Sequence, residues 1–72
     1  MAETGLKKRS LVLAGHQTSV ALEPAFWAVL EDLARQRSLS LPALVAEIDQ
    51  ERGEGPLASA LRLAVLAHAL ER

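Results

Sequence analysis

The sequence predicts a mainly α-helical domain with one short strand near its N-terminus. A short alternating run of residues ends at Pro24, and amphipathic helical spacing follows it. A long apolar stretch after a Gly-Pro link predicts a further helix. The 72 residues allow one domain with a small core, and the absence of cysteine excludes a disulfide or a cysteine-based metal site.

The predicted strand covers about residues 17–22. Alternate residues of an extended chain point to opposite faces. One face would carry Thr18, Val20 and Leu22, and the other Gln17, Ser19 and Ala21. A lone strand is not stable, and the chain offers few other strand candidates. The favoured partner is therefore the same strand of a second copy.

The residues before this strand are harder to assign. Residues 1–9 are expected to form a flexible basic N-terminal arm, and residues 10–72 the folded domain. Residues 11–14 are apolar without alternation. They could form a second strand or extend the first one across a bend at Gly15. With Leu11, Val12 and Leu13 all apolar, this segment is expected to be buried on both faces or covered by a partner.

Three helices are expected after the strand. The first covers about residues 24–37, because Pro24 suits a first helical turn and apolar residues repeat from Phe26 at helical spacing. The second covers about 41–52, with Ser40 as its N-cap. The third covers about 57–70 and is apolar on nearly all sides, which predicts that it is buried and packs across a dimer.

The charge distribution is uneven along the chain. The formal net charge is −1, but Lys7, Lys8 and Arg9 against Glu3 give residues 1–22 a net charge of +2. Residues 39–55 carry one basic and four acidic side chains, a net charge of −3. No apolar run approaches a membrane span, and residues 11–14 are too short for the core of a signal peptide. A cytoplasmic protein is expected.

The order of strand, helix and helix, with a proline at the strand exit and a serine cap, resembles ribbon-helix-helix proteins. In particular, the sequence resembles small bacterial ribbon-helix-helix domain proteins. The resemblance extends from about Lys8 to the C-terminus. It is carried by Lys8-Arg9-Ser10, Gly15-His16-Gln17-Thr18-Ser19-Val20, Leu22-Glu23-Pro24, Phe26-Trp27, Leu39-Ser40-Leu41, Ala46-Glu47-Ile48-Asp49 and Ser59-Ala60-Leu61-Arg62.

The resemblance implies an intertwined homodimer whose two strands form an antiparallel ribbon that binds DNA. Outward residues Gln17, Ser19 and Ala21 would contact bases, where Gln17 suits an adenine edge and Ala21 offers only a methyl group. Phosphates would be bound by Lys7, Lys8, Arg9 and, at the N-terminus of the second helix, Ser40. The dimer core would contain Thr18, Val20, Leu22, Phe26, Trp27, Leu30, Leu44 and Ile48.

Enzymatic and metal-binding functions find little support in the sequence. No set of nucleophile, base and orienting group is visible, and no phosphate-binding glycine loop. Asp49 is two residues from both Glu47 and Glu51, a spacing that does not place all three side chains on one helix face. His16 is interpreted as a turn residue and His68 as a packing residue. We therefore expect no enzyme, no metal and no cofactor.

Two functions remain open. The first is a homodimeric DNA-binding protein, a transcriptional regulator or an antitoxin-like protein. The basic arm and the capped second helix favour it. The second is a dimerisation and protein-interaction module with the same fold and little sequence-specific DNA reading, whose partner could bind the third helix. The weak polarity of Gln17, Ser19 and Ala21 and the acidic net charge favour this alternative.

Overall fold

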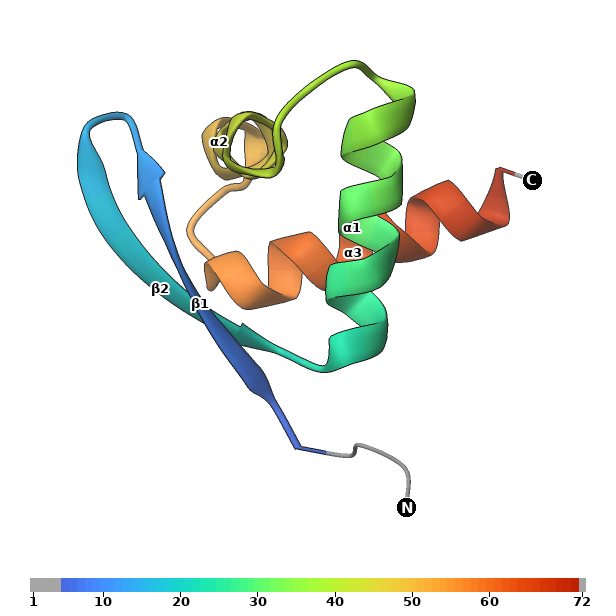
Figure 1. Cartoon of the computed structure of the whole chain (residues 1–72), viewed down its shortest axis with the longest axis horizontal. Helices are drawn as coiled ribbons and strands as arrows, with labels where there is room; N and C mark the ends of the chain where they lie inside the picture. The colour runs from blue at the N-terminus through green and yellow to red at the C-terminus, as the bar shows by residue number, and fades with distance from the viewer. Residues whose placement is uncertain (1–4, 72) are drawn as a thin grey trace.

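The computed structural model describes residues 5–71 of the chain. A β-hairpin lies against three helices, and α3 crosses behind α1 (Figure 1). The sequence predicts helices over 24–37, 41–52 and 57–70. The elements are β1 (Lys7–Leu13), β2 (His16–Leu22), α1 (Pro24–Gln36), α2 (Leu41–Glu51) and α3 (Leu57–Leu70).

The fold class with one strand is wrong, because residues 5–71 contain two strands; of the two possibilities left open for residues 11–14, the second strand is the one observed, as part of β1. β1 and β2 pair antiparallel within one chain, with Lys7 opposite Leu22 and Leu13 opposite His16. Ala14 and Gly15 connect them, with φ values of 52° and 83°. Positive φ at both central residues is typical of the two-residue type I′ turn, which suits the twist of a hairpin. β2 therefore has a partner strand without a second copy, and an intermolecular ribbon is not shown.

Lys7, Lys8 and Arg9 belong to β1, although the sequence predicts a flexible arm up to residue 9. Residues 11–13 are not buried on both faces within one chain. Leu11 and Leu13 are buried, whereas Val12 between them is 63% exposed. The apolar run thus hides an ordinary alternation, because Val12 is an apolar residue on the outer face of the hairpin.

The inner face of the hairpin packs on the helices to form the core. Leu22, Leu30 and Leu44 have no exposed side-chain surface, and Trp27 is 1% exposed. The Trp27 indole N–H donates a 2.7 Å hydrogen bond to the backbone oxygen of Lys7. α1 is therefore attached to β1, the strand farther from it along the chain. The core contains Leu11, Leu13, Val20, Leu22, Trp27, Leu30, Ala34, Leu44, Val45, Leu61 and Val65.

The link between α1 and α2 is fixed by local backbone chemistry. Leu39 N–H donates to Ala34 O at 2.8 Å and Ser38 N–H to Arg35 O at 3.1 Å. Ser38 has a φ of 58°. These bonds are those of a Schellman C-cap, in which glycine is the usual residue at the left-handed position. Ser40 then caps α2, because its Oγ accepts a 3.2 Å hydrogen bond from Ala43 N–H.

α3 contributes one side to the core and leaves the other uncovered by the described residues. Leu61 and Val65 are buried, and α3 contacts α1, α2 and β2. Arg62 binds the Glu23 carboxylate before α1 at 2.9 Å. Leu63, Leu66 and Leu70 are 64%, 52% and 75% exposed, so the expectation of a helix buried on all sides does not hold within one chain. No described helix is long and apolar enough to cross a membrane.

Candidate functional site

The outer face of the hairpin is a polar surface that takes no part in the core. Directly opposed residues of an antiparallel pair point to the same face. Lys8 lies opposite Ala21, Ser10 opposite Ser19, and Val12 opposite Gln17. All of these are exposed except Ala21, which is half-buried. We call this surface the outer ribbon face, and define it as Lys8, Ser10, Val12, Gln17, Ser19 and Ala21.

The three residues for which base contacts are expected all lie on this face. Gln17 and Ser19 are exposed, and the Ser19 hydroxyl lies 3.2 Å from the Ser10 hydroxyl across the ladder. No hydrogen bond of the Gln17 amide with a described residue is found, so both its donor and its acceptor are open to a ligand. Ala21 offers only its methyl group.

The three basic residues of β1 do not share one face. Lys8 belongs to the outer ribbon face, whereas Lys7 and Arg9 alternate with it. Lys7 remains exposed. Arg9 is half-buried, donates to the Glu31 carboxylate at 2.6 Å, and lies with its guanidinium 5.0 Å from the centre of the Trp27 ring. Its charge is thus already balanced by an acidic and an aromatic partner.

The N-terminus of α2 offers few free backbone N–H groups to a ligand. Ser40 Oγ is occupied by the Ala43 N–H, and Leu44 N–H donates to Ser40 O at 3.0 Å. Pro42 has no N–H to offer. Because few donors remain at this end, a phosphate would have to compete with the cap for Ala43. The positive end of the helix dipole still favours an anion there.

The residues for which a dimer core is expected lie mostly in the core of the single chain. Val20, Leu22, Trp27, Leu30 and Leu44 are at most 5% exposed without a second copy. Thr18, Phe26 and Ile48 are half-buried. The Phe26 ring lies 5.6 Å from the Arg62 guanidinium. A second copy is not needed to bury the five innermost side chains.

Ion pairs set the electrostatics of the surface. Each arginine in the described part of the chain has an acidic partner: Arg9 with Glu31, Arg35 with Asp32, Arg37 with Glu47, Arg52 with Asp49 and Arg62 with Glu23. Lys7 and Lys8 form no ion pair with any described residue. Of the lysine and arginine side chains that the structure describes, those without an acidic partner therefore lie at the base of the hairpin.

Among the acidic side chains of residues 5–71, Glu23 is the one whose pKa is shifted by its surroundings. A backbone hydrogen bond at Glu23 and then the side-chain hydrogen bond from Arg62 hold the pKa of this carboxyl below its ordinary value. Its carboxylate makes no capping bond to α1 and instead ties α3 to the strand exit. Glu23 thus has a structural role away from the outer ribbon face.

Sequence reasoning missed two of the six residues of this face, Ser10 and Val12. Ser10 and Val12 lie beside the expected base-contact residues, and Lys8 lies on the same face as they do. The period-two spacing of Lys8, Ser10 and Val12 is the signal that would have found them, because Leu11 and Leu13 fall on the opposite face. His16 begins β2 on an exposed position, and His68 is half-buried on α3. The described residues contain no cluster of three or more His, Asp or Glu side chains that could bind a metal.

Comparisons with known proteins give two similarities. A family model described as a ribbon-helix-helix domain matches residues 6–69. A solved structure of an uncharacterized protein from Bordetella pertussis Tohama I is 34% identical, with a TM-score of 0.82. The match covers 94% of this chain and 58% of the Bordetella chain. The search of curated proteins gave no match.

Proposed function

The chain belongs to the ribbon-helix-helix domain family, and from this membership we propose that it is a homodimeric DNA-binding protein, a transcriptional regulator or antitoxin-like protein. Ribbon-helix-helix families are generally non-catalytic DNA-binding proteins. In this proposal the outer ribbon face enters the major groove. The observation that carries it is a two-stranded antiparallel ribbon whose outer face is mostly polar and exposed and is not used by the core. A ribbon of this kind fits the major groove of B-DNA.

The side chains of the outer ribbon face suit base edges. The Gln17 amide can bind adenine in a bidentate manner. Val12, directly opposite Gln17, can contact the methyl group of thymine. Ser10 and Ser19 accept or donate hydrogen bonds to several base edges. This combination favours a site that contains A·T base pairs.

Phosphate binding would depend mainly on Lys7 and Lys8, because the described arginines already have acidic partners. Each phosphate contact lowers log K by about 0.9 per log unit of salt. A dimer that uses both lysines of each copy would make four such contacts, which gives a slope of about −3.6. This is a weak electrostatic contribution, so affinity at physiological salt would depend strongly on the base contacts.

The same charge distribution supports a second candidate function. A ribbon-helix-helix domain with few open cations and exposed leucines on α3 could act as a protein-interaction module. On this alternative, DNA binding would be weak and lost at physiological salt. The two functions therefore differ in whether a sequence motif is selected.

The test is selection from a random DNA pool at near-physiological salt, followed by affinity measurements on the selected site. We expect an enriched A·T-containing motif. Gln17→Ala should weaken binding to that motif by about 1–3 kcal/mol and relax the preference at one position. Lys8→Ala should weaken all sequences alike and reduce the salt slope by about one unit per copy that contacts DNA.

Arg35→Ala is the matched control, because it also removes one positive charge from an exposed side chain, but on α1. It should leave both affinity and salt slope close to wild type. If no motif is enriched and binding disappears by about 150 mM salt, only non-specific attraction remains, and the interaction-module function is favoured.

A further inference from the structure

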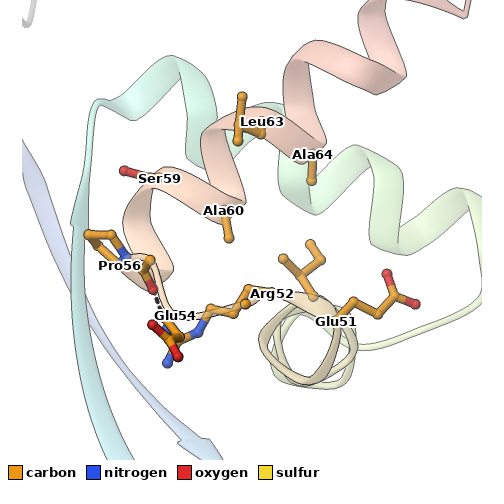
Figure 2. Close-up of a pocket in the computed structure, with 11 residues that line it drawn as sticks. Glu51, Arg52, Glu54, Pro56, Ser59, Ala60, Leu63 and Ala64 are labelled. Carbon is orange, nitrogen blue, oxygen red and sulfur yellow. Dashed lines mark hydrogen bonds between the residues drawn. The ribbon is translucent and has the colours of Figure 1, made fainter.

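A groove lies between the end of α2 and the first half of α3. Its volume of about 480 Å³ falls within the range of about 300–1,000 Å³ that is usual for ligand pockets. Figure 2 shows Ala60 and Ala64 pointing from α3 toward this groove, and Ile48 lines it from α2. Because two of these wall residues are alanines, the groove leaves room for a large apolar side chain of a partner.

The link between α2 and α3 keeps this groove open. Arg52 forms a 2.5 Å ion pair with Asp49 and donates to the backbone oxygen of Gly55. Arg52 is the one basic side chain that lines the groove, and its guanidinium is engaged on both sides. The groove is therefore formed in the free chain, and its only lining cation is already balanced by an acidic partner.

The edge of the groove carries two negative charges that no described cation balances. Glu51 and Glu54 line the groove, and they flank Arg52 where α2 passes into the link (Figure 2). Both are exposed, and neither forms an ion pair with a described residue. The last turn of α2 has no basic side chain, so Glu51 lies uncompensated near the negative end of the helix dipole. A cationic ligand would relieve this unfavourable placement.

The apolar surface continues from the groove along α3. Leu63 lines the groove, and Leu66 and Leu70 follow it at spacings of three and four residues. All three leucines are more than half exposed. From Ala60 to Leu70 the helix rises about 15 Å, or about three turns. An amphipathic helix with apolar side chains at positions i, i+3 or i+4, and i+7 fits a recess that is continued by such a strip.

From these features we propose that the groove and the adjoining leucines bind a basic amphipathic helix of a different protein. One large apolar side chain of that helix enters the groove between Ile48 and Ala60. Its Lys or Arg side chains lie beside Glu51 and Glu54. The apolar contacts supply most of the affinity, and the charges at the edge select a basic partner over an acidic one.

The charges at the edge argue against the other occupants of such a surface. A nucleic acid would be repelled by the two carboxylates. A second copy of α3 would bring Arg62, which is already bound to Glu23 at 2.9 Å, and no lysine. The lysines without an acidic partner, Lys7 and Lys8, lie on a strand. A helix from another protein is the occupant that matches both the shape and the charge.

This proposal gives a partner chemistry to the interaction-module function and does not require DNA binding. It is tested without DNA, so either can fail alone. The probe is a synthetic peptide of about 14 residues, the length at which an alanine-rich helix begins to be stable, with leucines along one face and lysines beside them. Titrated into the isotope-labelled full chain, it should shift the amide NMR signals of Ile48, Ala60 and Leu63. Its dissociation constant should rise with salt, because the charges at the edge are exposed.

Two changes test the role of charge. Glu51→Gln combined with Glu54→Gln should raise the dissociation constant of the lysine peptide at least tenfold, with the far-UV circular dichroism unchanged. Glu31→Gln combined with Asp32→Asn is the matched control, because it removes two acidic side chains from α1. It should leave binding close to wild type. A peptide with glutamates in place of the lysines needs no change in the protein, and it should not bind.

Three results would overturn the proposal. The first is a lysine peptide that does not bind or that shifts amides away from the groove. The second is equal binding of the lysine and glutamate peptides. The third is a groove already covered by a second copy, which would appear as shifts of the Ala60 and Leu63 amides with protein concentration when no peptide is present.

Discussion

The two-residue turn of the hairpin offers a direct test of strand pairing within one chain. Ala14 has a φ of 52°, a left-handed conformation that a side chain with a Cβ atom disfavours. Gly15, with a φ of 83°, adopts its conformation without this cost. Asn tolerates the left-handed region and is the preferred residue before Gly in a type I′ turn. We therefore expect Ala14→Asn to stabilise the protein.

The size of the gain follows from the cost that the turn now carries. A left-handed residue with a Cβ atom costs about 1–2 kcal/mol, of which Asn recovers a part, so we expect about 0.5–1 kcal/mol. In a domain of 60–100 residues, 1 kcal/mol shifts Tm by about 4–8 °C. Ala14→Asn should therefore raise Tm by about 2–8 °C. Ala14→Val should lower it, because a β-branched side chain is strongly disfavoured at positive φ.

The assay is thermal unfolding followed by circular dichroism at several protein concentrations. Ser38→Gly is the internal control, since Ser38 occupies the left-handed position of the α1 C-cap at a φ of 58° and does not depend on strand pairing. It should give a gain of similar size. If Ser38→Gly stabilises the chain but Ala14→Asn has no effect or destabilises it, the Ala14–Gly15 turn is not formed and the hairpin is wrong.

Two further predictions concern the contacts that join the elements. Trp27→Phe removes the 2.7 Å hydrogen bond to Lys7 O and leaves unfilled volume in the core, so urea unfolding followed by circular dichroism should show a loss of about 2–3 kcal/mol; a loss below about 0.5 kcal/mol would contradict the anchoring role. Glu23→Gln should lower Tm at pH 7, because the charged carboxylate binds Arg62 in the folded state. The pKa of Glu23 is lowered on folding, so this stabilisation is present above the ordinary pKa of about 4.3 and is lost as the pH falls through the lower folded value. Wild type and Glu23→Gln should then converge in Tm at acid pH, and a difference that persists there would exclude a charge effect.

The helices could be predicted from the sequence because their ends depend on local backbone and side-chain chemistry. The missing N–H and fixed φ of Pro24 suit a first helical turn, and Ser40 supplies the hydroxyl that caps α2. The alternation of Val20 and Leu22 with polar residues indicated the inner face of β2. These signals depend on a few neighbouring residues, so they are present in the sequence itself.

The strand that pairs with β2 could not be predicted in the same way. The apolar run of Leu11, Val12 and Leu13 conceals the alternation of β1, and Ala14-Gly15 is a weak turn signal because Ala rarely adopts positive φ. The choice between a partner strand in the same chain and one in a second copy depends on contacts between residues distant in sequence. Among these is the hydrogen bond from Trp27 to Lys7.

The order of one strand and three helices, the face with Gln17 and Ser19, and the resemblance to ribbon-helix-helix proteins could all be predicted from the amino-acid sequence alone. The packed structure was needed to see that Lys8 and Arg9, adjacent in sequence, have different surroundings: Lys8 is exposed on the outer ribbon face, and Arg9 is held by Glu31 and Trp27. The structure likewise shows that the apolar α3 has a buried side, with Leu61 and Val65, and an exposed side, with Leu63, Leu66 and Leu70. Periodicity shows which residues share a face of an element, but packing against the other elements decides which face is left for a partner.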